Sequence, residues 1–392
     1  VPAPAKECSQ VATTPEGEKP GGEASPSPAM VTVAGAGRVA EPKAEPQPAR
    51  RGRRQKTTGT LRKGENLFGW IFVSPSVAIL LLFLLAPIVL ALYISFTNWS
   101  GLTNPLSSSV KWTGLANYKT LLTQPGLYQQ DFGTSIRNNL YFVAFTVPLQ
   151  TALALALAVV VNNKLLRAKG LFRTIAYFPS VTSSIAITVI FIFLFQGSGV
   201  INTILGFFGI QGPNWLYDTR GVFTLVYNAF GVNNPPALVN HQFLGLPIWG
   251  WVAGPSLGMC VVIIMLVWTT SGTFMLFFLA ALQQISEDLD EASEIDGATP
   301  WQHFRRVTLP LLRPSLVLVL LLGFISTWQI FDQIFLIGPL NPATVTPAYF
   351  SYEISFRDSD FGAGAAVAFL LFCLIVFLTL IQRKFIKEDL TK

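Results

Sequence analysis

Long apolar stretches alternate with short polar connections along most of this 392-residue chain. A helix needs about 20 predominantly apolar residues to cross a hydrocarbon core of about 30 Å. Six stretches reach that length, and we place them near residues 70–97, 136–161, 173–196, 257–282, 315–337 and 362–382. The pattern predicts an all-α membrane protein whose core is a bundle of six transmembrane helices.

The first 66 residues are rich in Pro, Ala, Gly and Glu and contain almost no large apolar side chains. Such a segment buries too little surface to offset the entropy lost on ordering. We therefore expect residues 1–66 to be a disordered cytoplasmic tail and residues 67–392 to form the transmembrane domain. The end of the tail is basic, and is either an anchor to anionic membrane lipid or a topology signal only: Arg50, Arg51, Arg53, Arg54, Lys56, Arg62 and Lys63.

Composition and charge support a lipid environment. Hydrophobic residues make up 51% of the chain and charged residues 12%, whereas about a quarter of the residues in soluble domains are charged. The formal net charge of +6 lies in short runs beside apolar stretches, which is typical of orientation signals and not of a nucleic-acid-binding face. One set of connections holds the tail cluster and the runs 164–173, 305–313 and 383–387, and the other holds Lys111, Lys119, Arg220 and Arg357. Because Lys and Arg favour the cytoplasmic side, both termini are predicted to be cytoplasmic.

The second loop on the opposite side, residues 197–256, is the longest. It carries Trp215, Tyr227, Trp249 and Trp251 among Gly, Pro and Asn, and its stretch from Val222 to Phe230 is apolar. That stretch is either an interfacial or plug-like helix, or part of a surface loop with little structure. The pattern does not separate these two interpretations.

The connection at residues 285–310 carries strong local signals for two short helices. Ser286 can cap the first helix, acidic residues follow in its first turn, and Gly297 can end it. Thr299-Pro300-Trp301-Gln302 has the spacing of a capping box, and Pro310 is expected to end the second helix. Charge pattern alone is equally typical of a solvated amphipathic loop.

The same segment, EASEIDGATPWQHFRRVTLPLLRP, resembles the "EAA" loop of ABC-importer permeases: Glu-Ala-Ala, three residues, Gly, nine residues, an aliphatic residue, one residue, Leu-Pro. The residues in register are Glu291, Ala292, Gly297, Val307, Leu309 and Pro310, while Ser293 stands where the family has Ala. The stretches LFRTIAYFPSV, FLAALQQIS, FDQIFLIG and FRDSDFGAGAAVAFLLF look like the sugar-uptake, maltose-type branch. The resemblance covers residues 67 to 388. The tail and the long second loop depart from it, and the large domain that the maltose-type permease inserts after its first core span is missing here.

The resemblance implies a type I importer fold in the bacterial inner membrane, and a mechanism. The loop would be a coupling helix that docks in a separate ATPase subunit, with Glu291 and Asp296 bonding to basic residues, Ala292 allowing close contact and Gly297 the sharp turn. Ser293, Leu309 and Pro310 belong to the same motif. The implied partners are a second homologous permease, two ATPase subunits and an extracytoplasmic sugar-binding protein. The chain has no G-x-x-x-x-G-K-[ST] sequence, so ATP and Mg are expected on the ATPase and no cofactor on this chain.

Polar residues within the spans are candidates for the transport path. An Asp at a helix centre costs about 2.5–3.5 kcal/mol on insertion scales, so such groups tend to face a cavity or a partner. The helical spacing of Trp328, Gln329, Asp332 and Gln333 puts them on one face of the fifth span, as a surface for a sugar. Alternatively, Asp332 bonds only to neighbouring helices. Trp268 and Thr270 form a second candidate lining in the fourth span, where helix packing is the alternative role.

The sequence does not predict an enzyme. His241 and His303 are the two histidines and are expected on opposite sides of the membrane, so we expect no Ser/His/Asp set and no metal cluster. The substrate expected from the resemblance is a di- or oligosaccharide, with glycerol 3-phosphate or a polyol as the alternative. A secondary transporter that works without an ATPase is the other class, and it would need no docking loop.

Overall fold

The computed structural model describes residues 63–163, 166–231 and 242–390. The prediction of a disordered tail falls mainly on residues 1–62, which lie outside the described residues. The chain divides into the units Val1–Asn66 and Leu67–Lys392. The first helix, α1 (Lys63–Leu80), begins inside the segment assigned to the tail. This is expected where an apolar helix continues for a turn into polar sequence.

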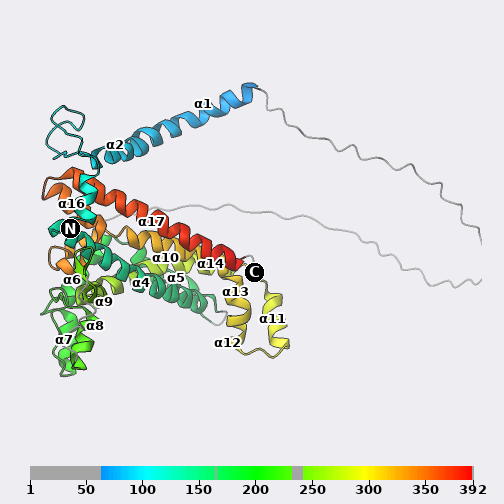
Figure 1. The fold of residues 1–392 in the computed structure, drawn as a ribbon. Helices are drawn as coiled ribbons and strands as arrows, with labels where there is room; N and C mark the ends of the chain where they lie inside the picture. The colour runs from blue at the N-terminus through cyan, green and yellow to red at the C-terminus, as the bar shows by residue number, and fades with distance from the viewer. Residues whose placement is uncertain (1–62, 164–165, 232–241, 391–392) are drawn as a thin grey trace, which may run out of the picture. The chain divides into compact units, whose positions relative to one another are not determined.

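The described chain is almost entirely helical (Figure 1). Its helical elements after α1 are η1 (Leu81–Leu85), α2 (Ala86–Ser95), α3 (Ala116–Leu122), α4 (Leu127–Asn162), α5 (Lys169–Val181), α6 (Ser184–Phe195), α7 (Val200–Phe207), α8 (Val222–Ala229), α9 (Ile248–Val252), α10 (Leu257–Leu282), α11 (Glu287–Ile295), α12 (Pro300–His303), η3 (Phe304–Thr308), α13 (Leu309–Leu311), α14 (Arg313–Trp328), α15 (Asp332–Ile337), η4 (Pro342–Thr344), α16 (Pro347–Phe356) and α17 (Phe361–Leu390).

Six helical segments are long and apolar enough to cross a membrane: Gly69–Ser95, Leu127–Asn162, Ser184–Phe207, Leu257–Leu282, Arg313–Ile337 and Phe361–Lys384. This confirms the all-α prediction with six spans. The second span begins earlier than expected because α4 continues as a helix beyond the apolar window.

The third span differs from the prediction of residues 173–196. The apolar run is divided into α5 and α6 by Thr182 and Ser183, which have extended backbones. The Thr182 hydroxyl donates to the Phe178 carbonyl at 3.0 Å, so a side chain satisfies one carbonyl near the break. Hydropathy does not detect such a break because both halves remain apolar.

The fifth span is also interrupted. Helix α14 ends at Trp328, and α15 starts at Asp332 after a non-helical Phe331. Carbonyls at the break are satisfied by side chains of other elements: Asn139 donates to the Trp328 carbonyl at 3.0 Å, and Thr346 to the Ile330 carbonyl at 3.0 Å. The break therefore costs no unpaired carbonyl at these two positions.

Helices α4 and α10 form the centre of the bundle and pack along each other, with α5 and α14 against both of them, and α17 packs against α14, α16 and α2. Small residues permit close approach: Ala154 and Ala158 of α4 pack in one core cluster with Met275 and Phe278 of α10. A Cβ on Gly272 would meet the Ala176 carbonyl of α5. The polar groups described below lie between these tightly packed helices.

The long loop between the third and fourth spans is structured where it is described. It contains α8, α9 and a two-residue antiparallel pairing of β1 (Gln242–Phe243) with β2 (Leu246–Pro247), while α7 lies within the third span. The stretch from Val222 is helical, so the surface-loop interpretation is wrong there. Residues 232–241 of this loop lie outside the described part.

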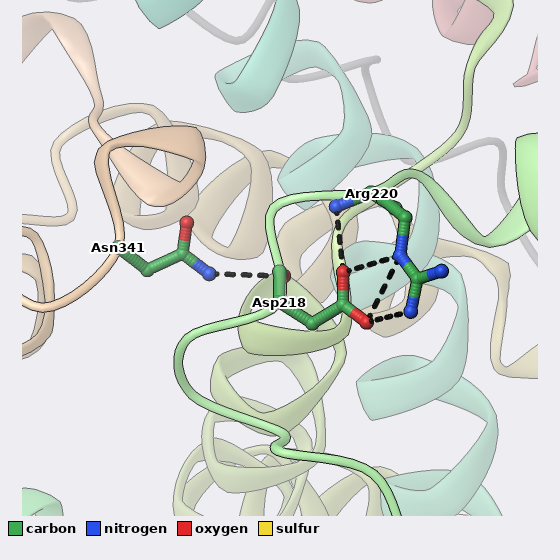
Figure 2. A network of polar contacts seen from close by, with 3 residues as sticks. All are labelled: Asp218, Arg220 and Asn341. Atoms are coloured by element: carbon green, nitrogen blue, oxygen red, sulfur yellow. Dashed lines mark hydrogen bonds and ion pairs between the residues drawn. The ribbon is translucent and has the colours of Figure 1, made fainter.

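A polar network connects this loop to the connection after α15 (Figure 2). The Arg220 guanidinium donates to the Asp218 carboxylate, with the shortest contact at 2.6 Å, and these bonds lower the pKa of Asp218. Asn341 donates to the Asp218 main-chain carbonyl at 3.2 Å. The loop is thereby held against the end of the bundle opposite α11 and α12 (Figure 1).

Candidate functional site

Helix α11 begins with a strongly acidic turn, because Glu287, Asp288 and Asp290 stand at its positive N-terminal end. Ser286 occupies the N-cap position with an extended backbone, but its side chain makes no capping hydrogen bond. Ser286 therefore has the predicted N-cap position, but the predicted capping hydrogen bond is absent. The acidic residues supply the favourable electrostatics at this end instead.

Gly297 ends α11 as predicted. Its φ is +72°, a conformation that glycine adopts without steric cost. The Ala298 amide bonds to the Ser293 carbonyl at 3.0 Å, and the Gly297 amide to the Glu294 carbonyl at 3.0 Å, which is the hydrogen-bond pattern of a Schellman motif. The chain thus reverses sharply between two short helices.

Helix α12 begins with the predicted capping box. The Gln302 amide donates to the Thr299 hydroxyl at 3.3 Å, and the Thr299 amide to the Gln302 side chain at 2.9 Å. The expectation that Pro310 ends this helix is wrong, because the helical path continues through η3 and α13 into α14. Pro310 has no N–H to donate, and the wider π-helical turn of η3 accommodates the lost bond.

The turn between α11 and α12 presents a protruding surface at one end of the bundle (Figure 1). Glu291, Ala292, Asp296 and Gly297 are exposed, as is Pro310, while Leu309 is half-buried. Large apolar side chains lie beside these carboxylates: Ile295 is 86% exposed and Trp301 is 66% exposed. Exposed apolar groups rimmed by carboxylates are typical of a protein-binding surface.

The two helices are joined by a cluster of side chains that the sequence pattern did not indicate. The His303 ring lies 2.7 Å from the Ser293 hydroxyl through Nδ1 and 3.1 Å from the Asp290 carboxylate through Nε2. The expectation that no Ser/His/Asp set could form is therefore wrong. The contact was not visible in the pattern because a turn brings together residues that are 10 and 13 positions apart.

A pocket of about 250 Å³ lies inside the bundle, where α4, α10 and the break between α14 and α15 meet. It includes Gln329, Asp332, Gln333 and Thr270 from the predicted set. The remaining lining residues are Thr146, Gln150, Leu266, Ser326, Thr327, Ile330 and Phe331. Most polar groups of this lining are hydroxyls and amides.

Asp332 lies at the pocket and also bonds to a neighbouring helix. Its carboxylate lines the pocket and accepts a hydrogen bond of 2.6 Å from the Ser184 hydroxyl. Ser184 is the first residue of α6 and Asp332 is the first residue of α15. The two broken spans thus meet at the starts of their second halves, where the helix dipole favours the Asp332 charge.

Trp328 and Trp268 lie outside this pocket. Trp328 is fully buried and packs against Leu371 and Ile375 of α17, because the helix ends at this residue and the expected common face with Asp332 is lost. Trp268 is 46% exposed and its ring lies 5.9 Å from that of Phe191. The structure thus does not bring the two rings together with the other predicted residues at this pocket.

Gln150 and Thr146 of α4 are the lining residues that sequence analysis missed. Both are fully buried, and the Gln150 amide nitrogen and the Thr146 hydroxyl have no hydrogen-bond partner. Thr270 donates to the Gln150 side-chain oxygen at 2.6 Å. A Cβ on Gly323 would clash with the Gln150 amide. Their spacing of four residues within an apolar span is a signal that could have identified them.

Metal ligation has no candidate in the described ranges: no group of three His, Cys, Asp or Glu side chains in residues 63–163, 166–231 and 242–390 is placed to hold an ion. The candidate sites are therefore a protruding helical turn and a polar pocket in the bundle.

Comparisons with known proteins cover nearly the whole transmembrane region. The family model for the binding-protein-dependent transport system inner membrane component matches residues 150–388. The chain is 29% identical over 329 residues to the lactose transport system permease protein LacF of Rhizobium radiobacter, covering 82% of this chain and 95% of that protein. It is 27% identical over 331 residues to the trehalose/maltose transport system permease protein MalF of Thermococcus litoralis, covering 83% and 96%.

Solved structures show the same fold. A chain of a bacterial ABC transporter involved in the import of the acidic polysaccharide alginate superimposes with a TM-score of 0.63 at 19% identity, covering 83% of this chain and 96% of that chain. The likeness extends over nearly all of that chain and confirms the predicted architecture of the bundle.

Proposed function

This chain belongs to the family of binding-protein-dependent transport system inner membrane components, and we propose that it is the permease subunit of an ATP-driven importer for a di- or oligosaccharide. In this proposal an extracytoplasmic binding protein delivers the sugar, and a separate ATPase drives its passage. The observation that carries the proposal is the exposed turn between α11 and α12, which holds the residues of the EAA motif.

The geometry of this turn suits docking to an ATPase subunit. Glu291 and Asp296 offer free carboxylates to basic side chains, and Ile295 and Trp301 add apolar surface beside them. The loop is joined to the bundle through the nearly continuous path from α12 to α14. A displacement of the turn would therefore be transmitted to α14, which borders the polar pocket. ATP and Mg would bind to the ATPase partner.

The polar pocket supports a sugar as cargo. The buried Gln150 amide and Thr146 hydroxyl, together with the half-buried Thr270 hydroxyl, are suited to sugar hydroxyls. At about 250 Å³ the pocket is smaller than most small-molecule sites, which measure about 300–1,000 Å³. We infer that a second, homologous permease subunit completes the chamber.

The first span supports both a second subunit and lipid as neighbours. Only 6% of the apolar window in Gly69–Ser95 is buried, so this helix has an apolar surface that needs another cover. The α11 end also collects basic residues of the connections: Arg167, Lys169, Arg173, Arg305, Arg306, Arg313, Arg383 and Lys384. By the positive-inside rule we place this end, and both termini, in the cytoplasm.

Uptake energetics test this proposal against a secondary transporter. Cells that express the chain with its transport partners are given radiolabelled lactose or maltose, and the membrane potential and the ATP pool are removed separately. We expect uptake to persist without the potential and to stop on ATP depletion. The reverse dependence would show a secondary transporter. Competition by glycerol 3-phosphate, but by neither disaccharide, would show the alternative substrate class.

A further inference from the structure

The Asp290–Ser293–His303 cluster joins the two helices of the turn between α11 and α12, which we call the docking turn. The Ser293 hydroxyl lies 2.8 Å from the Asp290 main-chain carbonyl and 2.7 Å from His303 Nδ1. An ionised Asp290 carboxylate accepts only, so the hydrogen of this contact lies on His303 Nε2, at 3.1 Å.

The ring therefore contacts two residues of α11 at once, through a different nitrogen in each case. The ring is protected and the carboxylate is accessible: the His303 side chain is 22% exposed and that of Asp290 is 50% exposed. Hydrogen bonds to charged groups are stronger than neutral ones.

We propose that His303 is a positioning residue that fastens α12 to α11 and makes the docking turn move as one rigid body. The inference rests on the proposed function and deepens it. The backbone bonds at Gly297 and the capping box at Thr299 are local to the turn and to one helix. The His303 contacts connect the two helices, and Ser293, the residue that departs from the EAA motif, supplies one of them.

Hydrogen exchange of the full chain in lipid nanodiscs tests the fastening without any partner. His303→Gln should speed exchange of the protected α11 amides about 10-fold, since bonds to charged groups contribute about 1.5–3 kcal/mol. Ser293→Ala, which restores the motif residue, should have a smaller effect in the same direction. Asp288→Asn, which removes an α11 carboxylate outside the cluster, is the matched control and should change exchange less than about two-fold.

Equal protection of α11 in the wild type and in His303→Gln would overturn the proposal.

Coupling is measured on the complete complex, as ATP hydrolysed per sugar imported. We expect His303→Gln to raise this ratio severalfold, with Ser293→Ala in between. An unchanged ratio would overturn the positioning role. If no ATPase associates even with the wild type, the proposed function fails, while the exchange experiment still decides whether the fastening exists.

Discussion

Gly297 is the residue whose backbone the docking turn most depends on. At φ +72° proline cannot substitute, because its ring holds φ near −65°. Gly297→Pro should abolish uptake and lower recovery of the ATPase with the tagged chain, with membrane insertion unchanged. A Cβ at this position meets nothing within 4 Å, so Gly297→Ala should cost only about 1 kcal/mol of backbone strain and keep partial uptake.

Uptake at the wild-type level by Gly297→Pro would contradict the docking role. Immunoblots of the membrane fraction provide the check that both variants are inserted in equal amounts.

Glu291 tests the charge of the same surface. Its carboxylate is exposed on α11, and Glu291→Lys places a cation where we expect basic residues of the partner. Co-purification of the ATPase and sugar uptake should both fall at least 10-fold, the range expected when one charge of a buried interfacial pair is lost. Asp288→Lys reverses a charge on the same helix and is the matched control. Equal losses in both variants would indicate a general charge effect.

Asp332 tests the pocket. Asp332→Ala removes a lining carboxylate and the 2.6 Å bond from Ser184, so sugar uptake should change while the complex still assembles. Ser184→Ala removes the bond and keeps the carboxylate. If Asp332→Ala prevents assembly of the complex, the residue has a structural role and does not line the path.

Among the secondary-structure elements, the six spans, the C-terminal end of α11 and the start of α12 were predicted from the sequence. Apolar length located the six spans, and the Gly297 and Thr299 signals act within one turn, so they needed no tertiary information. The breaks before Ser184 and Asp332 could not be predicted in this way. Neither break contains a glycine or proline, and side chains from distant helices, such as Asn139, satisfy the freed carbonyls.

The candidate site residues also divide into those that local sequence predicted and those that depend on tertiary contacts. Gly297, Thr299 and the polar residues after Trp328 were identified from local pattern. The His303 contacts and the position of Trp328 depend on where one element meets another, which spacing along a straight helix does not describe. Gln150 lies in a long apolar run, and its role became visible only when α10 and Gly323 were placed against it.

Helix α8 of the long loop has an exposed apolar face. Phe223, Val226, Tyr227 and Phe230 are exposed at helical spacing, with Phe230 at 81%, and α8 contains no charged residue. We expect this face to lie in the membrane interface and not to plug the bundle. A fluorophore on Phe230→Cys should be quenched by spin-labelled lipid headgroups. Quenching by aqueous iodide alone would place the face in water.

In the molecule as a whole, several surfaces of the bundle are left uncovered by the chain itself. The pocket is small for its proposed cargo, the first span is largely uncovered, and the docking turn exposes both apolar and acidic groups. The proposed neighbours, which are a second permease, lipid and an ATPase, would account for these three features. The proposed function therefore depends on contact between the α11–α12 turn and an ATPase subunit.

That contact can be measured directly by site-specific photo-crosslinking. A photoreactive amino acid at Ile295, which is 86% exposed beside the EAA residues, should crosslink to an ATP-binding subunit, and the yield should change when ATP is added. The same group at Phe377, exposed on the apolar surface of α17, is the control and should not reach that subunit. Crosslinks from Ile295 to lipid alone, or to no protein in the active complex, would contradict the account.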